Sequence, residues 1–140
     1  MPGICVVDTN VVVSGLIAAG SNSPPARILN AMLDGNLMYL MSRKLLEEYA
    51  AVLGRPAILR NHGLTPDTVD RLLTELVANS IWREPNPVAG APDPGDDHLW
   101  ALLASEPTAK LVTGDRLLLE NPPRGVSVVS PRVLVDALLQ

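Results

Sequence analysis

The stretch Ile4-Cys5-Val6-Val7-Asp8-Thr9-Asn10 decides how the rest of the chain is interpreted. Its four consecutive apolar residues are typical of a strand buried on both faces, as in the middle of a parallel sheet. Asp8 follows at once, at the carboxyl end of the strand, where open α/β sheets bind their ligands. Two interpretations are open: Asp8 or Asn10 caps the following helix, or Asp8 belongs to a ligand site.

Strands and helices alternate along the remainder of the chain. The expected strands lie at 4–7, 37–41, 81–83, 109–113 and 126–129. The expected helices begin after residue 10 and cover 24–34, 43–53, 66–78, 94–105 and 131–139, with short turns at 57–60 and 117–119. Residues 85–94 contain four prolines and are expected to form a loop. This alternation predicts an α/β sandwich with a mainly parallel sheet, as one domain over residues 1–140.

The composition restricts the class of protein. The chain has 140 residues, of which 47% are hydrophobic, so one core can form. It has no apolar run of 18 residues, no start typical of a secretory signal and a single cysteine, so we expect a cytoplasmic protein without a membrane span or an internal disulfide. The net charge of −4 argues against a general nucleic-acid binder, although acids gathered around metal ions would give the same balance.

Asp115 repeats the pattern of Asp8. The apolar strand residues Leu111 and Val112 lead into Thr113, Gly114 and then Asp115. Parallel strands present their carboxyl ends at one edge of a sheet, so both acids are expected at the same edge. The alternative for Asp115 is an ordinary turn residue.

Glu48 lies in a helix that Ser42 is expected to cap. At about 100° per residue, Glu48 falls at the border of the apolar face, with Leu45 and Val52 as near neighbours. A carboxylate buried there without a partner would be costly. Either a metal ion or a salt bridge to an arginine would relieve that cost.

Asp96 and Asp97 open a further helix. Asp96 is explained by a favourable interaction with the helix dipole. Asp97 has Ala101 and Ala104 as its i+4 and i+7 neighbours, and these small residues would let its face approach the sheet closely. Asp97 is therefore the expected functional acid of the pair, with Asp96 in reserve.

Converging carboxylates would raise one another's pKa values, and Mg²⁺ or Mn²⁺ would remove that penalty. A metal held this way can orient and activate water and stabilise charge on a phosphate under in-line attack. Nucleophile elbows, phosphate-binding loops and zinc clusters are absent from the sequence. Both histidines, His62 and His98, are expected to be exposed polar residues.

These motifs, in this order and spacing, resemble the PIN domain family, most closely its bacterial VapC-type toxins, over essentially the whole chain. The resemblance implies a three-layer α/β/α sandwich and a Mg²⁺- or Mn²⁺-dependent ribonuclease. It also implies a small antitoxin partner and a homodimer or higher homo-oligomer. By position, it assigns the acidic site to Asp8, Glu48, Asp97 and Asp115, and supporting roles to Thr9, Asn10, Asp96 and Thr113.

Two other functions stay open. One is a PIN-like module that binds RNA or a partner without cutting it. The other is a phosphatase of the haloacid dehalogenase type, which also begins with a strand followed by Asp. Such a phosphatase usually needs a second Asp two residues later, and Asn10 occupies that position.

Overall fold

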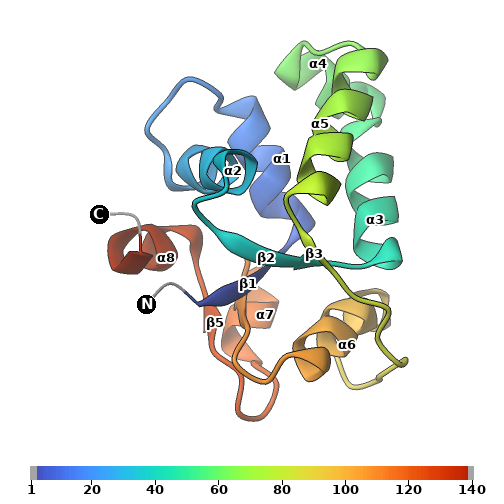
Figure 1. The fold of residues 1–140 in the computed structure, drawn as a ribbon, viewed down its shortest axis with the longest axis vertical. Helices are drawn as coiled ribbons and strands as arrows, with labels where there is room; N and C mark the ends of the chain where they lie inside the picture. Colours follow the sequence, from blue (N-terminus) through green and yellow to red (C-terminus); the bar gives the residue numbers. More distant parts are fainter. Residues whose placement is uncertain (1–2, 139–140) are drawn as a thin grey trace.

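The computed structural model describes residues 3–138, and within them the chain forms one five-stranded sheet. The strands are β1 (Ile4–Val7), β2 (Met38–Met41), β3 (Ile81–Trp82), β4 (Lys110–Val112) and β5 (Val128–Val129). Their order is β3-β2-β1-β4-β5, and every neighbouring pair is parallel. The predicted parallel α/β sheet is therefore confirmed, with β1 at its centre (Figure 1).

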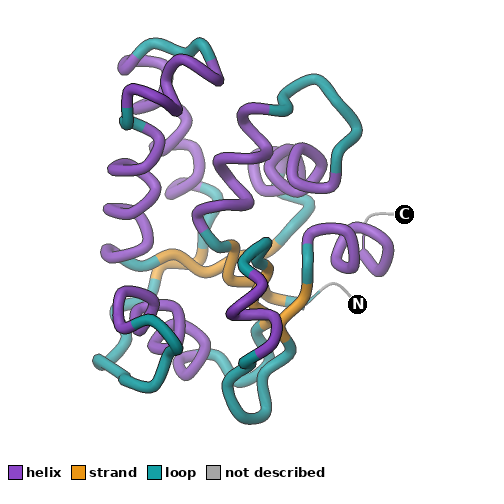
Figure 2. Tube along the Cα trace, turned by 180° about the vertical axis from the view of Figure 1, so that it is seen from behind, coloured by secondary structure: helices purple, strands orange, loops and turns teal. Residues whose placement is uncertain are grey.

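Eight α-helices surround this sheet in the described part of the chain. They are α1 (Thr9–Ile17), α2 (Pro24–Asp34), α3 (Arg43–Leu53), α4 (Pro56–His62), α5 (Pro66–Ala78), α6 (Asp97–Ser105), α7 (Arg116–Glu120) and α8 (Pro131–Leu138). Helices α1 to α5 lie on one side of the sheet and α6 and α7 on the other, as Figures 1 and 2 both show. The arrangement is the expected three-layer α/β/α sandwich.

The first strand is as buried as its sequence predicts. Cys5, Val6 and Val7 have no exposed surface, because helices cover both faces of the sheet. The strand pairs with β2 on one side and β4 on the other. From β1 the chain continues to β2, and it returns later to β4 on the opposite side. This reversal is the type of topological switch point at which α/β sheets bind ligands, and Asp8 stands directly at it.

Several element boundaries differ from the sequence prediction. Helix α4 has seven residues where one turn was expected, and β5 has two where four were expected. The expected start of the helix at Pro94 is a separate 3₁₀ turn, Pro94–Asp96, followed by α6 from Asp97. Helix α8 begins at Pro131 as predicted, and Leu139 lies outside the described residues.

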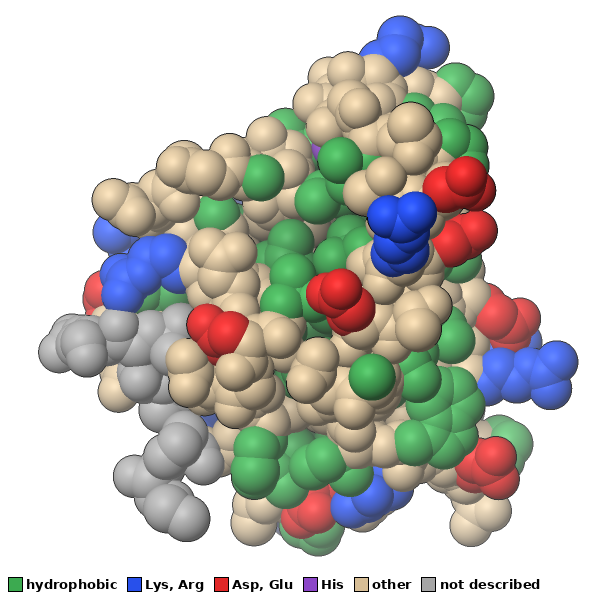
Figure 3. All heavy atoms as spheres, turned by 45° about the horizontal axis from the view of Figure 1, so that its top comes forward, with side chains coloured by type: hydrophobic (Ala, Val, Ile, Leu, Met, Phe, Trp, Pro, Cys, Tyr) green, Lys and Arg blue, Asp and Glu red, His purple; other side chains and the backbone are tan. Residues whose placement is uncertain are grey.

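The surface carries mixed charge. On the face shown in Figure 3, the Lys and Arg side chains lie at separate places among Asp and Glu. Across residues 3–138, no helix is both long and apolar enough to pass through a membrane.

Candidate active site

Asp8 is fixed in position at the end of β1 by two neighbours. Its Oδ1 accepts a hydrogen bond of 2.8 Å from the Thr9 amide, so it caps α1. Its Oδ2 accepts a hydrogen bond of 2.7 Å from the Thr113 hydroxyl. Only 6% of Asp8 is exposed, and this burial raises its pKa, with the negative charges of Glu48 and Asp115 adding to the effect. Asp8 is thus both a helix cap and an acid in a cavity, so its two interpretations are compatible.

Thr113 and Asn10 connect the ends of β1 and β4. The buried Thr113 hydroxyl accepts a hydrogen bond of 2.9 Å from the Asp115 amide while it donates to Asp8. Asn10 accepts a hydrogen bond of 3.1 Å from the Gly114 amide, and its Nδ2 lies 3.4 Å from both Asp8 Oδ2 and Thr113 Oγ1. The side chain of Asn10 therefore contacts the end of β4, and the helix cap at this position is Asp8.

Asp115 lies at the end of β4 and caps α7 through a hydrogen bond of 2.9 Å from the Leu117 amide to its Oδ1. It also lines the same cavity as Asp8. The two strand-end acids therefore meet at one edge of the sheet, as their sequence pattern predicted.

Glu48 reaches this cavity from the second turn of α3. Ser42 caps the helix, and Leu45, Tyr49 and Leu53 are buried on its apolar face. This leaves the Glu48 side chain 31% exposed, at the border of that face. The Thr9 hydroxyl donates a hydrogen bond to its Oε1.

The second oxygen of Glu48 has a partner on a different element. His98 Nε2 lies 3.0 Å from Glu48 Oε2. This hydrogen bond is the main reason that the pKa of Glu48 is lowered, in spite of its partial burial. An arginine salt bridge was the expected alternative to a metal, and the structure places a histidine there instead.

The side chains of Asp96 and Asp97 lie in different cavities, although the two residues are adjacent in the chain. Asp96 lines the cavity with Asp8, Glu48 and Asp115. Burial and the negative charges of Asp8 and Glu48 raise its pKa to about 6. Asp97 Oδ1 instead accepts a hydrogen bond of 3.0 Å from the Ala91 amide and lines a neighbouring cavity. The structure therefore brings together Asp96, and not the expected Asp97, with the other three acids.

His98 differs from the sequence expectation of an exposed residue, since its side chain is only 13% exposed. One ring nitrogen of His98 and one carboxylate oxygen each of Glu48 and Asp96 lie within 4.8 Å of one another, and these are atoms that could bind a metal ion. No spacing rule could have indicated this contact, because His98 and Glu48 lie fifty residues apart on different helices. His62 is half-buried, with Nδ1 accepting a hydrogen bond of 3.0 Å from the Leu64 amide.

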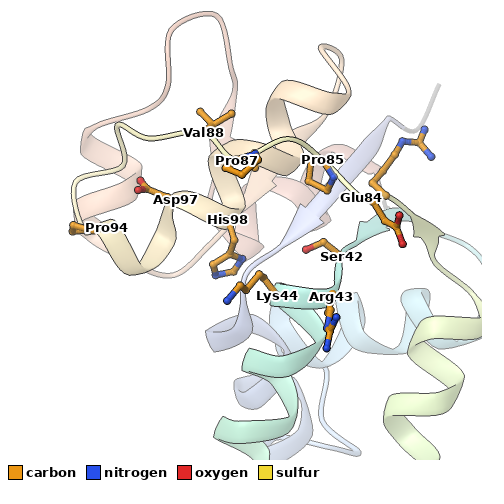
Figure 4. A pocket seen from close by; sticks show the side chains of 12 residues that line it. Ser42, Arg43, Lys44, Glu84, Pro85, Pro87, Val88, Pro94, Asp97 and His98 are labelled. Carbon is orange, nitrogen blue, oxygen red and sulfur yellow. The ribbon is translucent and has the colours of Figure 1, made fainter.

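Two adjoining cavities lie on this edge of the sheet. The acidic one has a volume of about 350 Å³ and is also lined by Arg55, which no motif in the sequence indicates. The neighbouring one has a volume of about 620 Å³, and its lining includes Arg43, Lys44 and Arg83. His98 belongs to the lining of this second cavity while it bonds to Glu48 in the first. Figure 4 shows His98 and Asp97 directed to different sides of α6.

The donor set of the acidic cavity fits a divalent cation. Four carboxylates from different elements line one small space, and oxygen ligands of this kind are those that Mg²⁺ and Mn²⁺ take. Burial, and then the negative charge of the neighbouring acids, raises the pKa values of Asp8 and Asp96, and a bound cation would stabilise their ionised forms. The lowered pKa of Glu48 keeps a third carboxylate ionised.

The fold and the site define a parallel α/β protein with an acidic cluster at its switch point, which is where such sheets bind ligands. A sequence model of the PIN domain matches residues 5–117, which is most of the chain. The chain therefore belongs to the PIN domain family, whose members are generally nucleases that use divalent metals. The comparison with curated proteins gave no match. The family favours a nuclease over the phosphatase alternative, and Asn10, bonded to Gly114, does not supply the second acid of such a phosphatase.

Proposed function

We propose that this protein is a metal-dependent endoribonuclease that hydrolyses phosphodiester bonds in RNA. The observation that supports this most is that Asp8, Glu48, Asp96 and Asp115 line one cavity at the switch point of the sheet. A bound Mg²⁺ or Mn²⁺ would supply Lewis-acid stabilisation of the phosphate and a more acidic water. Asp8, Glu48, Asp96 and Asp115 would hold the ion.

The other polar residues of the site orient these acids. The Thr113 hydroxyl and the Thr9 amide donate hydrogen bonds to Asp8 and hold its carboxylate in one orientation. Thr9 also donates a hydrogen bond to Glu48 Oε1, and His98 Nε2 lies 3.0 Å from the other oxygen of that carboxylate. Such preorganisation matters because catalytic groups must be held within fractions of an ångström of their productive geometry.

The RNA strand would extend from the acidic cavity into the larger cavity beside it. Arg55 lies at the first cavity, and Arg43, Lys44 and Arg83 line the second. These cations can neutralise backbone phosphates on either side of the bond to be cut, which an otherwise acidic protein needs. Pro85, Pro87 and Val88 add an apolar lining against which a base could rest.

The substitution Asp8→Asn tests the activity directly. Asparagine can still accept the hydrogen bond from the Thr9 amide, so the cap and the fold should be kept, while the negative charge is lost. Purified wild-type protein with Mn²⁺ or Mg²⁺ should cleave single-stranded or structured RNA, and the variant should lose about 100-fold or more of the rate. If the wild type binds RNA and leaves it intact under all metal conditions, the non-catalytic binding module is correct instead.

We further propose that the nuclease is the toxin of a type II toxin–antitoxin pair, acting on RNA in the cytoplasm. The support for this is the resemblance of the motifs to VapC-type toxins. Induced expression of the wild type should then stop growth, while Asp8→Asn should not. Co-expression of a small antitoxin from an adjacent reading frame should restore growth and yield a complex with a homodimer or higher homo-oligomer of this chain. Growth that continues at full rate with an active nuclease would indicate an RNA-processing role.

A further inference from the structure

We infer that His98 is a metal ligand, and that its imidazole nitrogen makes the site bind a first-row transition-metal ion in preference to Mg²⁺. This rests on the proposed metal-dependent function and adds the identity of the metal class. The four carboxylates alone would make an all-oxygen site, which is the kind of site that suits Mg²⁺. A nitrogen donor changes that preference.

The distances around His98 are those of a ligand set. Its Nε2 lies 3.0 Å from Glu48 Oε2, and ligand atoms of Glu48, Asp96 and His98 lie within 4.8 Å of one another. Two ligands at right angles around an ion, each about 2.1 Å from it, are about 3 Å apart. The three side chains would therefore need only small shifts to share one ion.

The orientation of the imidazole ring also supports His98 as a ligand. His98 is in the first turn of α6, and its side chain is 13% exposed, so the ring has little freedom to turn outward. Its other nitrogen, Nδ1, is buried and has no hydrogen-bond partner among the described residues. Among the described residues the polar contact of the ring is therefore through Nε2, the atom directed at Glu48. On binding an ion, Nε2 would give up its hydrogen bond to Glu48 and the ring proton would be carried by Nδ1.

The chemistry of the donors sets the selectivity. Mg²⁺ prefers six oxygen ligands at about 2.0–2.1 Å and keeps several of its waters. Imidazole nitrogen is a softer ligand, and the affinity of such mixed sites rises from Mn²⁺ through Fe²⁺ and Co²⁺. Mn²⁺ is the weakest binder in that series, so a preference for Mn²⁺ over Mg²⁺ is a stringent test.

The alternative is that His98 only orients Glu48 from outside the metal site. In that case, removal of His98 would weaken Mn²⁺ and Mg²⁺ binding by the same factor, since both ions use the Glu48 carboxylate. As a ligand, His98 would affect Mn²⁺ far more than Mg²⁺. The ratio of the two affinities therefore distinguishes the roles.

The test uses the full chain, freed of metal by a chelator and titrated calorimetrically with Mn²⁺ or Mg²⁺. We expect wild type to prefer Mn²⁺, and His98→Gln to lose about tenfold or more in Mn²⁺ affinity with Mg²⁺ affinity little changed. His62→Gln is the matched control, because His62 bonds to Leu53 and Leu64 and does not line the acidic cavity. Pulsed electron paramagnetic resonance of Mn²⁺-loaded wild type should show a directly bound ¹⁴N that the His98→Gln variant lacks.

The spectroscopic experiment on wild type stands even if the variant folds poorly. The inference is overturned if wild type shows no bound nitrogen, or if His98→Gln loses affinity for both metals equally. The nuclease proposal stays intact in that case, provided that Asp8-dependent RNA cleavage persists. Absence of any metal binding together with absence of RNA cleavage overturns both.

Discussion

The hydroxyl of Thr113 donates a hydrogen bond of 2.7 Å to Asp8 Oδ2, across 105 residues of sequence. The same hydroxyl oxygen accepts a hydrogen bond from the Asp115 amide. One fully buried side chain thus connects the acids at the ends of two neighbouring strands, β1 and β4. The distance between these acids is therefore controlled by the sheet and not by mobile loops.

Replacing Thr113 by valine should uncouple these acids. The change keeps the shape but removes the donor to the buried Asp8 Oδ2 and leaves the partly buried Asp115 amide without its acceptor, which costs about 1–3 kcal/mol of folding free energy. We expect a lower midpoint in urea unfolding and a cleavage rate reduced about tenfold or more, as for loss of a residue that orients a metal ligand. Thr113→Ser retains the hydroxyl and should remain close to wild type. A fully active Thr113→Val protein would show that the hydroxyl has no positioning role.

Replacement by asparagine should weaken metal binding at Asp96 and leave it nearly unchanged at Asp97. Asp97→Asn retains an oxygen that can accept the hydrogen bond from Ala91, so metal affinity and cleavage should stay within about twofold of wild type. Asp96→Asn removes a charge from the acidic cavity and should weaken metal binding about tenfold or more. Calorimetric metal titration of both variants decides between the two acids. Loss of metal binding in Asp97→Asn alone would restore the assignment that its neighbouring alanines suggested.

The strand-end part of the site could be predicted because it follows from simple rules. An apolar run followed by Asp8, and a second followed by Asp115, place two acids at one edge of any parallel sheet. The spacing of the apolar residues in α3 set the direction of its buried face, and that direction correctly placed Glu48 at the border of the face. These inferences use the periodicity of one element at a time.

The remaining part depends on features that periodicity does not contain. Residues Pro94–Asp96 form a 3₁₀ turn before α6, and at about 120° per residue this turn alters the direction of Asp96 relative to an α-helix. The expected uninterrupted helix therefore favoured Asp97. The contact between His98 and Glu48 arises only when α6 and α3 meet at the edge of the sheet.

Asp96 should make the metal-free protein less stable as the pH rises from about 4 to 6. Folding raises the pKa of Asp96 to about 6 from the value of about 3.9 of an unfolded chain. Between these values the folded state binds a proton that the unfolded state releases, so the stability that Asp96 contributes falls across about pH 4–6. Asp96→Asn should remove this dependence and raise the melting temperature at pH 7.5 by a few degrees.

Thermal melts with a chelator at pH 5 and 7.5 measure this effect. Asp70→Asn, at an exposed position of α5, is the matched control and should leave the pH dependence unchanged. A melting temperature of Asp96→Asn at or below that of wild type at pH 7.5 would contradict the predicted charge repulsion.

Gly15 allows α1 and α2 to approach each other closely. A Cβ atom at this position would lie 2.5 Å from the Pro25 carbonyl oxygen and 3.0 Å from Leu29 Cβ. Because the closer atom is backbone, Gly15→Ala should cost about 1–3 kcal/mol of folding free energy, despite the gain of about 1 kcal/mol in helix propensity. Urea unfolding measures the difference. Gly3→Ala, with no atom within 4 Å, is the control, and equal stability of the two variants would refute the packing argument.

The cations of the larger cavity should contribute to RNA affinity without contributing to metal binding. Lys44 and Arg43 line this cavity from the first turn of α3, outside the set of acids. If each neutralises one phosphate, removing both should reduce the slope of log affinity against log salt concentration by about 1.4 in total for a single strand. We therefore expect the double variant Arg43→Ala/Lys44→Ala to bind RNA more weakly at low salt and to bind Mn²⁺ normally. Arg132→Ala, on α8, should change neither quantity. An unchanged salt slope in the double variant would mean that the RNA leaves the acidic cavity in another direction, past Arg55.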